Sequence, residues 1–127
     1  MPRPTAGAGQ IVIDVKACAV NFPDTLIIED KYQFKPARPF APGGEVAGLV
    51  AEVGEGVTGF KVGNRVIAGC GNGGMSEAVA VGVHNVYHLP EGHDFAEGAS
   101  LLMTYGTSIH ALVDRGHIQE GETLLVL

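Results

Sequence analysis

The side chains that could bind a metal ion are few in this sequence and far apart. The two cysteines, Cys18 and Cys70, stand in separate apolar segments without a CxxC spacing. His84 and His88 are four positions apart, which in a strand separates them by about 13 Å. A catalytic zinc ion needs three Cys, His or carboxylate ligands together. We therefore expect no metal site, and we interpret the cysteines as buried free thiols in a reducing compartment.

A second candidate for chemistry is the glycine-rich stretch at residues 69–74, which could cradle a phosphate. A phosphate loop of that kind follows a strand, opens a helix and has the spacing G-x-G-x-x-G. This stretch lacks both the spacing and a following helical pattern. We therefore interpret it as a bulged loop that leads from one strand into the next.

The elements that must position such residues are mostly strands in the first two thirds of the chain. Residues 10–20 alternate apolar and polar side chains, the pattern of a half-buried strand. A short helical turn is expected to open near Asn21, and three prolines make residues 33–44 an extended loop. Further strands are expected within residues 45–54, 64–69, 76–82 and 84–90. Short strands separated by glycines predict a small, bulged β-barrel or sandwich.

The last third of the chain changes from alternation to helical periodicity. Asp94 and Glu97 have the spacing of a capping box ahead of one helix, and Gly116 is the expected C-cap of the next. Residues 121–127, GETLLVL, then form a continuous apolar run. Such a run is typical of a strand buried on both faces of a parallel sheet. We therefore expect two helices and one buried strand here.

Composition excludes several classes of function. The 127 residues carry a net charge of −6, and the eight Lys and Arg residues are scattered. Nucleic-acid binding requires a basic stripe that neutralises phosphates, so no nucleic-acid partner is expected. No apolar run approaches the roughly 18 residues that cross a bilayer, and the polar start MPRPTAGAGQ is unlike a leader. The sequence thus predicts a soluble, cytoplasmic protein with no membrane partner.

Several segments together carry a family resemblance. They are VNFPD, PGGEVAGLVAEVG, VGNRV, GGMSEAVAV and LLMTYGTSIHAL, in this order along nearly the whole chain. The set resembles the catalytic domain of the medium-chain dehydrogenase/reductase superfamily, and within it the zinc-independent quinone oxidoreductase branch. The implied fold is mainly β with flanking helices. Residues 1–92 would form a GroES-like bulged β-barrel without its first hairpin. Residues 93–127 would add the connecting helices and the first strand of a Rossmann domain whose remainder is absent.

The resemblance also implies a chemistry without zinc. The three catalytic zinc ligands of zinc-binding relatives fall at the places of Asn21, Gly44 and Met103 in this chain. None of these side chains is a usual zinc ligand. The structural-zinc lobe of those relatives requires more cysteines than the two present here. The implied reaction is hydride transfer from NADPH to a quinone or a conjugated carbonyl, which orientation and hydrogen bonds can support without a Lewis acid.

Three residues gain roles from the resemblance, each with a simpler alternative. Asn21 would lie near the nicotinamide ribose or the substrate oxygen, or it only caps the turn NFPD. Tyr32 would line the active-site cleft and hydrogen-bond a carbonyl, or it is a half-buried loop aromatic. Thr107 would contact the nicotinamide end of NADPH from a helix start, or its hydroxyl only satisfies a backbone group there. For Asp24 and Glu45 we expect structural roles, with Glu45 holding nearby backbone or an arginine.

On this resemblance the protein is an NADPH:quinone oxidoreductase-like enzyme and a homo-oligomer. An enoyl or enone reductase is the nearest alternative, and a stand-alone domain that acts in binding or assembly is a second. The chain lacks the glycine-rich turn that would cradle the pyrophosphate of the cofactor. We therefore expect the isolated chain to be inactive. Its apolar end, TLLVL, is expected to dimerise or to pack on its own helices.

Overall fold

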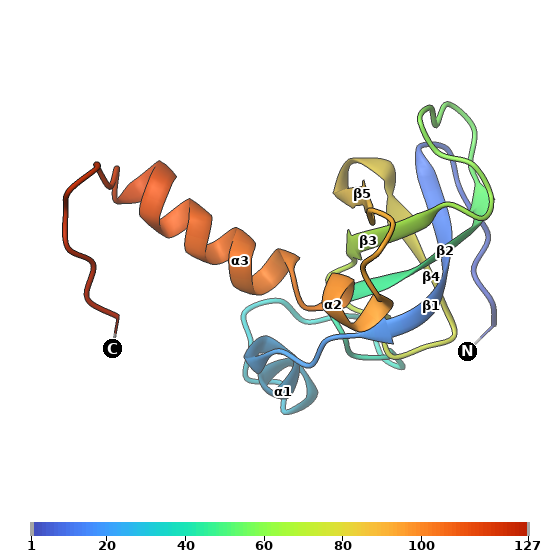
Figure 1. Ribbon diagram of the computed structural model, residues 1–127. Helices are drawn as coiled ribbons and strands as arrows, with labels where there is room; N and C mark the ends of the chain where they lie inside the picture. The colour runs from blue at the N-terminus through green and yellow to red at the C-terminus, as the bar shows by residue number, and fades with distance from the viewer. Residues whose placement is uncertain (1, 127) are drawn as a thin grey trace.

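The computed structural model describes residues 2–126, which are built around a curled antiparallel sheet (Figure 1). The sheet has the order β4-β1-β2-β3-β5. The register of β1 against β2 shifts between Val12 and Ile13 and again between Val15 and Ala17, which marks bulges. The strands are β1 (Gln10–Cys18), β2 (Glu45–Val53), β3 (Arg65–Gly69), β4 (Ala78–Gly82) and β5 (Val86–His88). The predicted bulged β-architecture is confirmed, in the form of a half-barrel of five strands.

The helical segments lie between strands and at the end of the chain. They are α1 (Phe22–Ile28), the 3₁₀ turn η1 (Val83–Asn85), α2 (Phe95–Ala99), α3 (Leu102–Ile109) and the π-helix η2 (His110–Arg115). The N–H of Glu97 donates to the Asp94 carboxylate at 2.7 Å, and the N–H of Asp94 donates to the Glu97 carboxylate at 3.1 Å. The capping box predicted for α2 is therefore confirmed.

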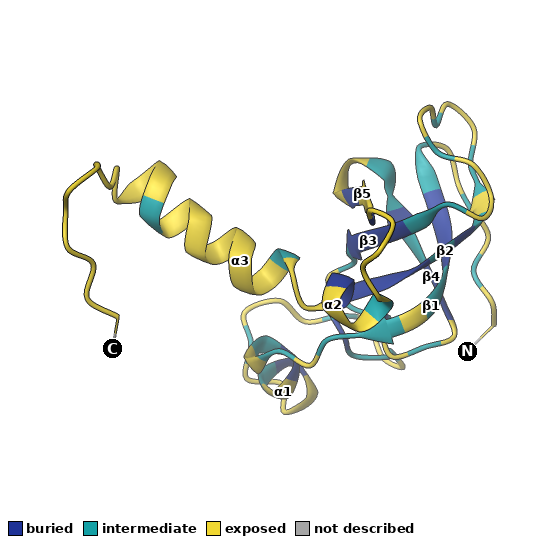
Figure 2. Cartoon of the chain, viewed as in Figure 1, coloured by how far each residue is buried: buried dark blue, intermediate teal, exposed yellow. Residues whose placement is uncertain are grey.

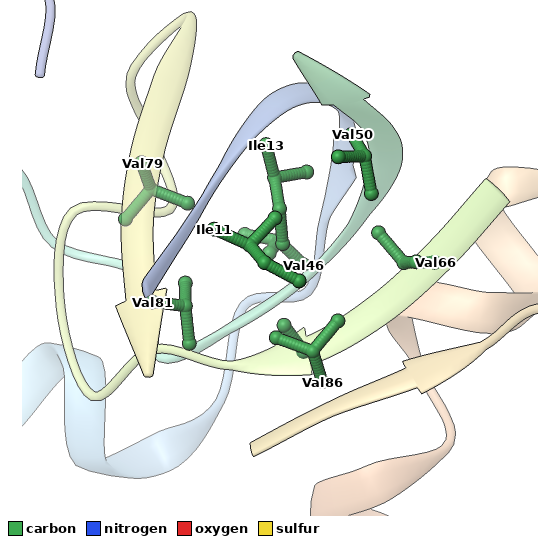
Figure 3. Packing of buried hydrophobic residues seen from close by; sticks show 9 residues of the cluster. Ile11, Ile13, Val46, Val50, Val66, Val79, Val81 and Val86 are labelled. Atoms are coloured by element: carbon green, nitrogen blue, oxygen red, sulfur yellow. The ribbon is translucent and has the colours of Figure 1, made fainter. Parts of the chain in front are cut away.

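The core has two parts because the central strand β2 is buried on both of its faces. The inner part consists of Ile11, Ile13, Val46, Val50, Val66, Ala68, Val79, Val81 and Val86 (Figure 3). The outer part, beneath α2, consists of Ala47, Ile67, Leu89 and Ala99. Successive side chains of a strand point to opposite faces. Glu45 therefore shares the face of Ala47, on the side that α2 and the start of α3 cover.

The end of the chain differs from its prediction. Figures 1 and 2 show α3 leaving the sheet as an exposed arm, with the C-terminal segment beyond it. Residues 122–126 form no strand, and Leu125 and Val126 are 78% and 79% exposed; Leu127 lies outside the described residues. A strand needs a neighbour to complete its hydrogen bonds, and the sheet lies on the other side of α3. The predicted buried strand is wrong here, and so is the predicted packing of this end on its own helices.

The helix η2 has its C-cap at the predicted residue, Gly116, but the backbone conformation there differs from the one expected of a glycine C-cap. Gly116 is the C-cap, as expected, and its N–H donates to the carbonyl oxygen of Ala111 at 2.7 Å. The left-handed conformation that favours glycine falls instead on His117, whose φ is 50°.

Candidate functional site

Asn21 begins α1 and is held in place through its backbone. Its φ of −112° and ψ of 158° are extended, and its N–H donates to Asp24 Oδ2 at 2.8 Å. The other oxygen of Asp24 accepts the N–H of Gly43 at 3.1 Å. Asp24 is only 3% exposed, so its carboxylate ties the Asn21 turn to the loop before β2. These contacts agree with the structural role expected for Asp24.

The two glycines before β2 have different steric surroundings. Gly43 has a φ of +96°, and a Cβ there would lie 2.6 Å from Cys18 Sγ and 2.9 Å from the backbone nitrogen of Met75. A side chain at Gly43 is therefore excluded. A Cβ at Gly44 would meet nothing closer than the carbonyl oxygen of Gly71 at 3.5 Å, an ordinary contact. Gly44 thus has room for a Cβ atom, whereas Gly43 has none.

Glu45 joins Asn21 to the start of α3. Its Oε2 accepts the side-chain amide of Asn21 at 3.3 Å. Its Oε1 accepts the backbone N–H groups of Leu102 at 2.5 Å and of Met103 at 3.2 Å. The side chain is 1% exposed. Every one of these partners is a donor, so Glu45 acts purely as an acceptor, which is the hydrogen-bonding capacity of a carboxylate.

The bonds to Leu102 and Met103 give α3 the N-terminal cap that its own sequence lacks. The N-cap position is Leu101, whose side chain cannot accept a hydrogen bond. The first N–H groups of a helix need acceptors and carry partial positive charge, which a nearby carboxylate stabilises. Glu45 supplies both from β2. The expectation that Glu45 holds nearby backbone is confirmed, whereas its alternative partner, an arginine, is not found among its contacts.

The other two predicted site residues stand apart from this network in the described part of the chain. Tyr32 is half-buried at a bend after α1. Thr107 is exposed and lies inside α3, whose first residue is Leu102. The prediction that Thr107 stands at a helix start is therefore wrong, because the helix begins one turn and a half earlier than the sequence suggested. No hydrogen bond in residues 2–126 connects Tyr32 or Thr107 to Asn21.

The two cysteines lie near the same glycine loop as free thiols. Cys70 Sγ donates to the carbonyl oxygen of Gly43 at 3.3 Å, and Cys18 Sγ to that of Ala19 at 3.4 Å. Burial, followed by the nearby Cys18, raises the pKa of the Cys70 thiol to about 12. Burial and then the Asp24 carboxylate raise the pKa of Cys18. Both groups therefore stay protonated and are poor nucleophiles.

The glycine-rich loop after β3 has no backbone donors to offer a phosphate over most of its length. Three of its N–H groups donate to carbonyl oxygens of the loop before β2. The N–H of Gly71 donates to Gly44, that of Gly73 to Ala41 and that of Gly74 to Gly43. These bonds join the two loops side by side. The interpretation of residues 69–74 as a structural loop is consistent with this arrangement.

Metal ligands and cavities do not add to this site. Within residues 2–126, no three His, Cys, Asp or Glu side chains converge as a metal site would require. A cavity of about 770 Å³ is lined by residues 2–4, by Ala41 and by residues between 70 and 80. It contains none of Asn21, Tyr32, Glu45 and Thr107, so it is separate from the site. In the same part of the chain, no helix combines the length and the apolar character needed to cross a bilayer.

Comparison with known proteins places this fold in a family. Residues 7–91 match the alcohol dehydrogenase GroES-like domain, and the chain belongs to that family. Relatives that it resembles over nearly its whole length are named quinone oxidoreductase or quinone oxidoreductase-like protein. A quinone oxidoreductase-like protein 2 homolog of Nematostella vectensis is 39% identical over 121 residues, and the quinone oxidoreductase of Homo sapiens is 39% identical over 118.

Solved structures show the same fold. The human synaptic vesicle membrane protein VAT-1 homolog-like protein superposes with a TM-score of 0.91 at 32% identity, over 94% of this chain and 39% of that one. A quinone oxidoreductase of Escherichia coli, complexed with NADPH, superposes with a TM-score of 0.81 at 27% identity, over 91% of this chain and 35% of that one. The chain spans about a third of its curated relatives, 33% of the Nematostella protein and 36% of the human one.

The contact between Asn21 and Glu45 had one signal in the sequence. Glu45 and the apolar Ala47 are two positions apart in β2, so their side chains lie on the same face of the strand, which is buried. A buried polar group is almost always hydrogen-bonded. The sequence therefore indicated that Glu45 has partners, although it did not identify them.

Proposed function

We propose that this chain is the substrate-side domain of an NADPH-dependent oxidoreductase that passes hydride to a quinone or a conjugated carbonyl. The observation that supports this most directly is the likeness to quinone oxidoreductases across nearly the whole chain, 92% of it for the human enzyme. We divide the chain into a barrel at residues 1–92 and a connecting part at residues 93–127. We further infer that the protein works in the cytoplasm.

The site suits a reaction that uses no zinc. The places of the zinc ligands in zinc-binding relatives hold Asn21, Gly44 and Met103. The amide of Asn21 is already bonded to Glu45, and Gly44 has no side chain. Hydride transfer to a quinone places negative charge on its oxygen, and a well-placed hydrogen-bond donor stabilises that charge. Asn21 has a second amide hydrogen for this purpose, and Tyr32 has a hydroxyl.

The described residues fit the nicotinamide end of NADPH but not its pyrophosphate. Asn21 and Thr107 offer an amide and an exposed hydroxyl for the nicotinamide end of NADPH. In the loop at residues 69–74, the N–H groups of Gly71, Gly73 and Gly74 are bonded to carbonyl oxygens, so this loop does not fit the pyrophosphate. When bound, NADPH supplies the hydride. We infer that the isolated chain binds it weakly and does not turn over.

A chimeric enzyme tests this proposal. The 127 residues replace the matching stretch of the human quinone oxidoreductase, and NADPH oxidation is measured with a panel of quinones and of enoyl thioesters. Quinone-dependent turnover is expected, with no turnover by the 127 residues alone. A folded chimera that binds NADPH but reduces none of the substrates would refute the function. Stoichiometric zinc in an active chimera would refute the zinc-free chemistry.

Single substitutions in the chimera test the assigned residues. Asn21→Ala is expected to lower kcat by about tenfold, the effect of one hydrogen bond of about 1.4 kcal/mol made in the transition state. Tyr32→Phe removes only a hydroxyl and is expected to act in the same direction. Thr107→Ala is expected to raise the KM for NADPH instead. Thr104→Ala, on the same exposed helix, is the matched control for Thr107 and should leave both parameters unchanged.

A second candidate function is reduction of a conjugated enoyl group. The crystal structure of the CurK enoyl reductase superposes on 96% of this chain with a TM-score of 0.85 at 30% identity. Both reactions deliver hydride to a conjugated acceptor. Turnover of enoyl thioesters but not of quinones by the chimera would favour this candidate. A role as a binding or assembly domain would require that the 127 residues act without a cofactor.

The exposed apolar surface supports a homo-oligomer. Besides Leu125 and Val126, Ile109 and Val113 are more than half exposed on α3 and η2. Burial of apolar surface is the main favourable term in association. We infer that a second copy of the chain covers part of this surface.

A further inference from the structure

Glu45 connects two parts of the chain that are distant in the sequence. Its hydrogen-bond partners lie 24 residues before it, at Asn21, and 57 and 58 residues after it, at Leu102 and Met103. The two carboxylate oxygens have different partners: Oε2 accepts the Asn21 side-chain amide, and Oε1 accepts the backbone N–H groups of Leu102 and Met103 in α3. A single planar carboxylate therefore contacts both elements.

The helix α3 has few other attachments to the sheet. All of its residues except the half-buried Leu102 are exposed, as Figure 2 shows. The Leu102 side chain packs against the outer core of Ala47, Ile67, Leu89 and Ala99. The direction in which α3 leaves the sheet thus depends on one apolar contact and on the hydrogen bonds of Glu45.

The Asn21 side chain depends on Glu45 in a different way from the Asn21 backbone. Its backbone N–H is fixed by Asp24. Its side-chain amide is fixed by Glu45. A movement of Glu45 would therefore reorient the amide while the turn itself stays in place.

We propose that Glu45 is a positioning residue that couples the Asn21 amide to the first turn of α3. Because the carboxylate is rigid, a tilt of α3 that moves Oε1 also moves Oε2 and with it the Asn21 amide. The significance for substrate and cofactor rests on the proposed function, in which Asn21 faces the acceptor and α3 carries Thr107. The coupling itself is a property of the 127-residue chain.

The coupling is tested on the ¹⁵N-labelled chain by NMR. Glu45→Gln keeps the size of the side chain but replaces charge-assisted bonds by weaker neutral ones. We expect the Asn21 side-chain amide and the backbone amides of Leu102 and Met103 to shift together, and the two backbone amides to exchange with solvent about tenfold faster. The matched control is Glu97→Gln, which weakens the cap of α2 and should leave the Asn21 amide unchanged.

The reciprocal variant separates coupling from simple support. Asn21→Ala removes the amide and leaves Glu45 in place, so the resonances of Leu102 and Met103 should still shift. Unchanged resonances of these two residues in Asn21→Ala would overturn the proposal, and so would a response of only one partner in Glu45→Gln. If Glu45→Gln does not fold, Asn21→Ala alone decides.

Kinetics of the active chimera distinguish this inference from the proposed function. Glu45→Gln should lower kcat and also raise the KM for NADPH, each by several-fold, because both elements move. Asn21→Ala should lower kcat about tenfold and raise the KM for NADPH less than Glu45→Gln does, because it affects α3 only through Glu45. A parent chimera without turnover would refute the proposed function and leave the NMR result intact. An active chimera without coupling in the NMR experiment would refute the positioning role alone.

Discussion

The glycine pair before β2 provides a sharp test of the local geometry. Gly43→Ala places a methyl group at a backbone φ of +96°, against Cys18 Sγ at 2.6 Å and the Met75 nitrogen at 2.9 Å. The unfavourable φ costs about 1–3 kcal/mol, and the overpacking costs about 1–3 kcal/mol. We expect a loss of about 3 kcal/mol in the free energy of unfolding. The methyl group of Gly44→Ala meets only ordinary contacts and should change stability by about 0.5 kcal/mol or less.

Urea denaturation measures both variants against the unchanged chain. The chain has no Trp, so far-UV circular dichroism is the suitable signal. With an m-value of about 1.5 kcal/mol/M, a loss of 3 kcal/mol lowers the midpoint by about 2 M. Equal midpoints for the two variants would show that the positive φ and the close contacts at Gly43 do not set the stability. A large loss in Gly44→Ala alone would refute the steric comparison.

Three further outcomes are expected from other parts of the chain. The Cys70 thiol should react with a maleimide at least about tenfold faster in urea than in the folded protein, because only the thiolate is reactive. Burial raises the pKa of this thiol to about 12 in the folded protein, so the unfolded chain loses the proton first, and the free energy of unfolding should fall as pH rises above about 8.5. Equally fast labelling of the folded chain would contradict the protected thiol. Arg65→Met should cost about 1–2 kcal/mol, because the guanidinium lies 4.3 Å from the centre of the Phe95 ring and donates to a carbonyl oxygen before α2. The control Arg3→Met breaks only an exposed ion pair and should cost less than about 1 kcal/mol of stability. Equal losses of stability in Arg65→Met and Arg3→Met would show that the contact with Phe95 does not stabilise the fold. Leu125→Asp should weaken concentration-dependent self-association in sedimentation velocity, and a strictly monomeric parent chain would contradict the homo-oligomer.

The parts of the fold that were predictable from the sequence depend on contacts between near neighbours. The alternation in residues 10–20 gave β1, whose bounds are Gln10–Cys18. The pair Asp94 and Glu97 gave the start of α2, because a capping box joins residues three apart. In both cases the pattern and the interaction occupy the same short stretch of chain.

The site was only partly predictable because its contacts are long-range. Asn21 and Glu45 were each identified as notable, yet their hydrogen bond spans 24 positions and could not be read from either segment. The start of α3 was misplaced for the same reason, since its cap comes from β2 rather than from a local polar residue. The apolar run at residues 121–127 indicated burial, but burial also requires a partner surface, which no local pattern specifies.

The cap that Glu45 supplies also has a consequence for the order of folding. The start of α2 is stabilised by its own residues, so this helix can begin to form from local sequence alone. The eight residues of α3 continue directly into the six of η2, a length that is still marginal for an isolated helix, and the acceptor for the first N–H groups of α3 is a side chain of β2. The helix α3 should therefore form only after β2 is in place in the sheet. Its helicity during refolding would report the assembly of the barrel, and it should appear in the same kinetic phase as the slow, long-range strand pairing.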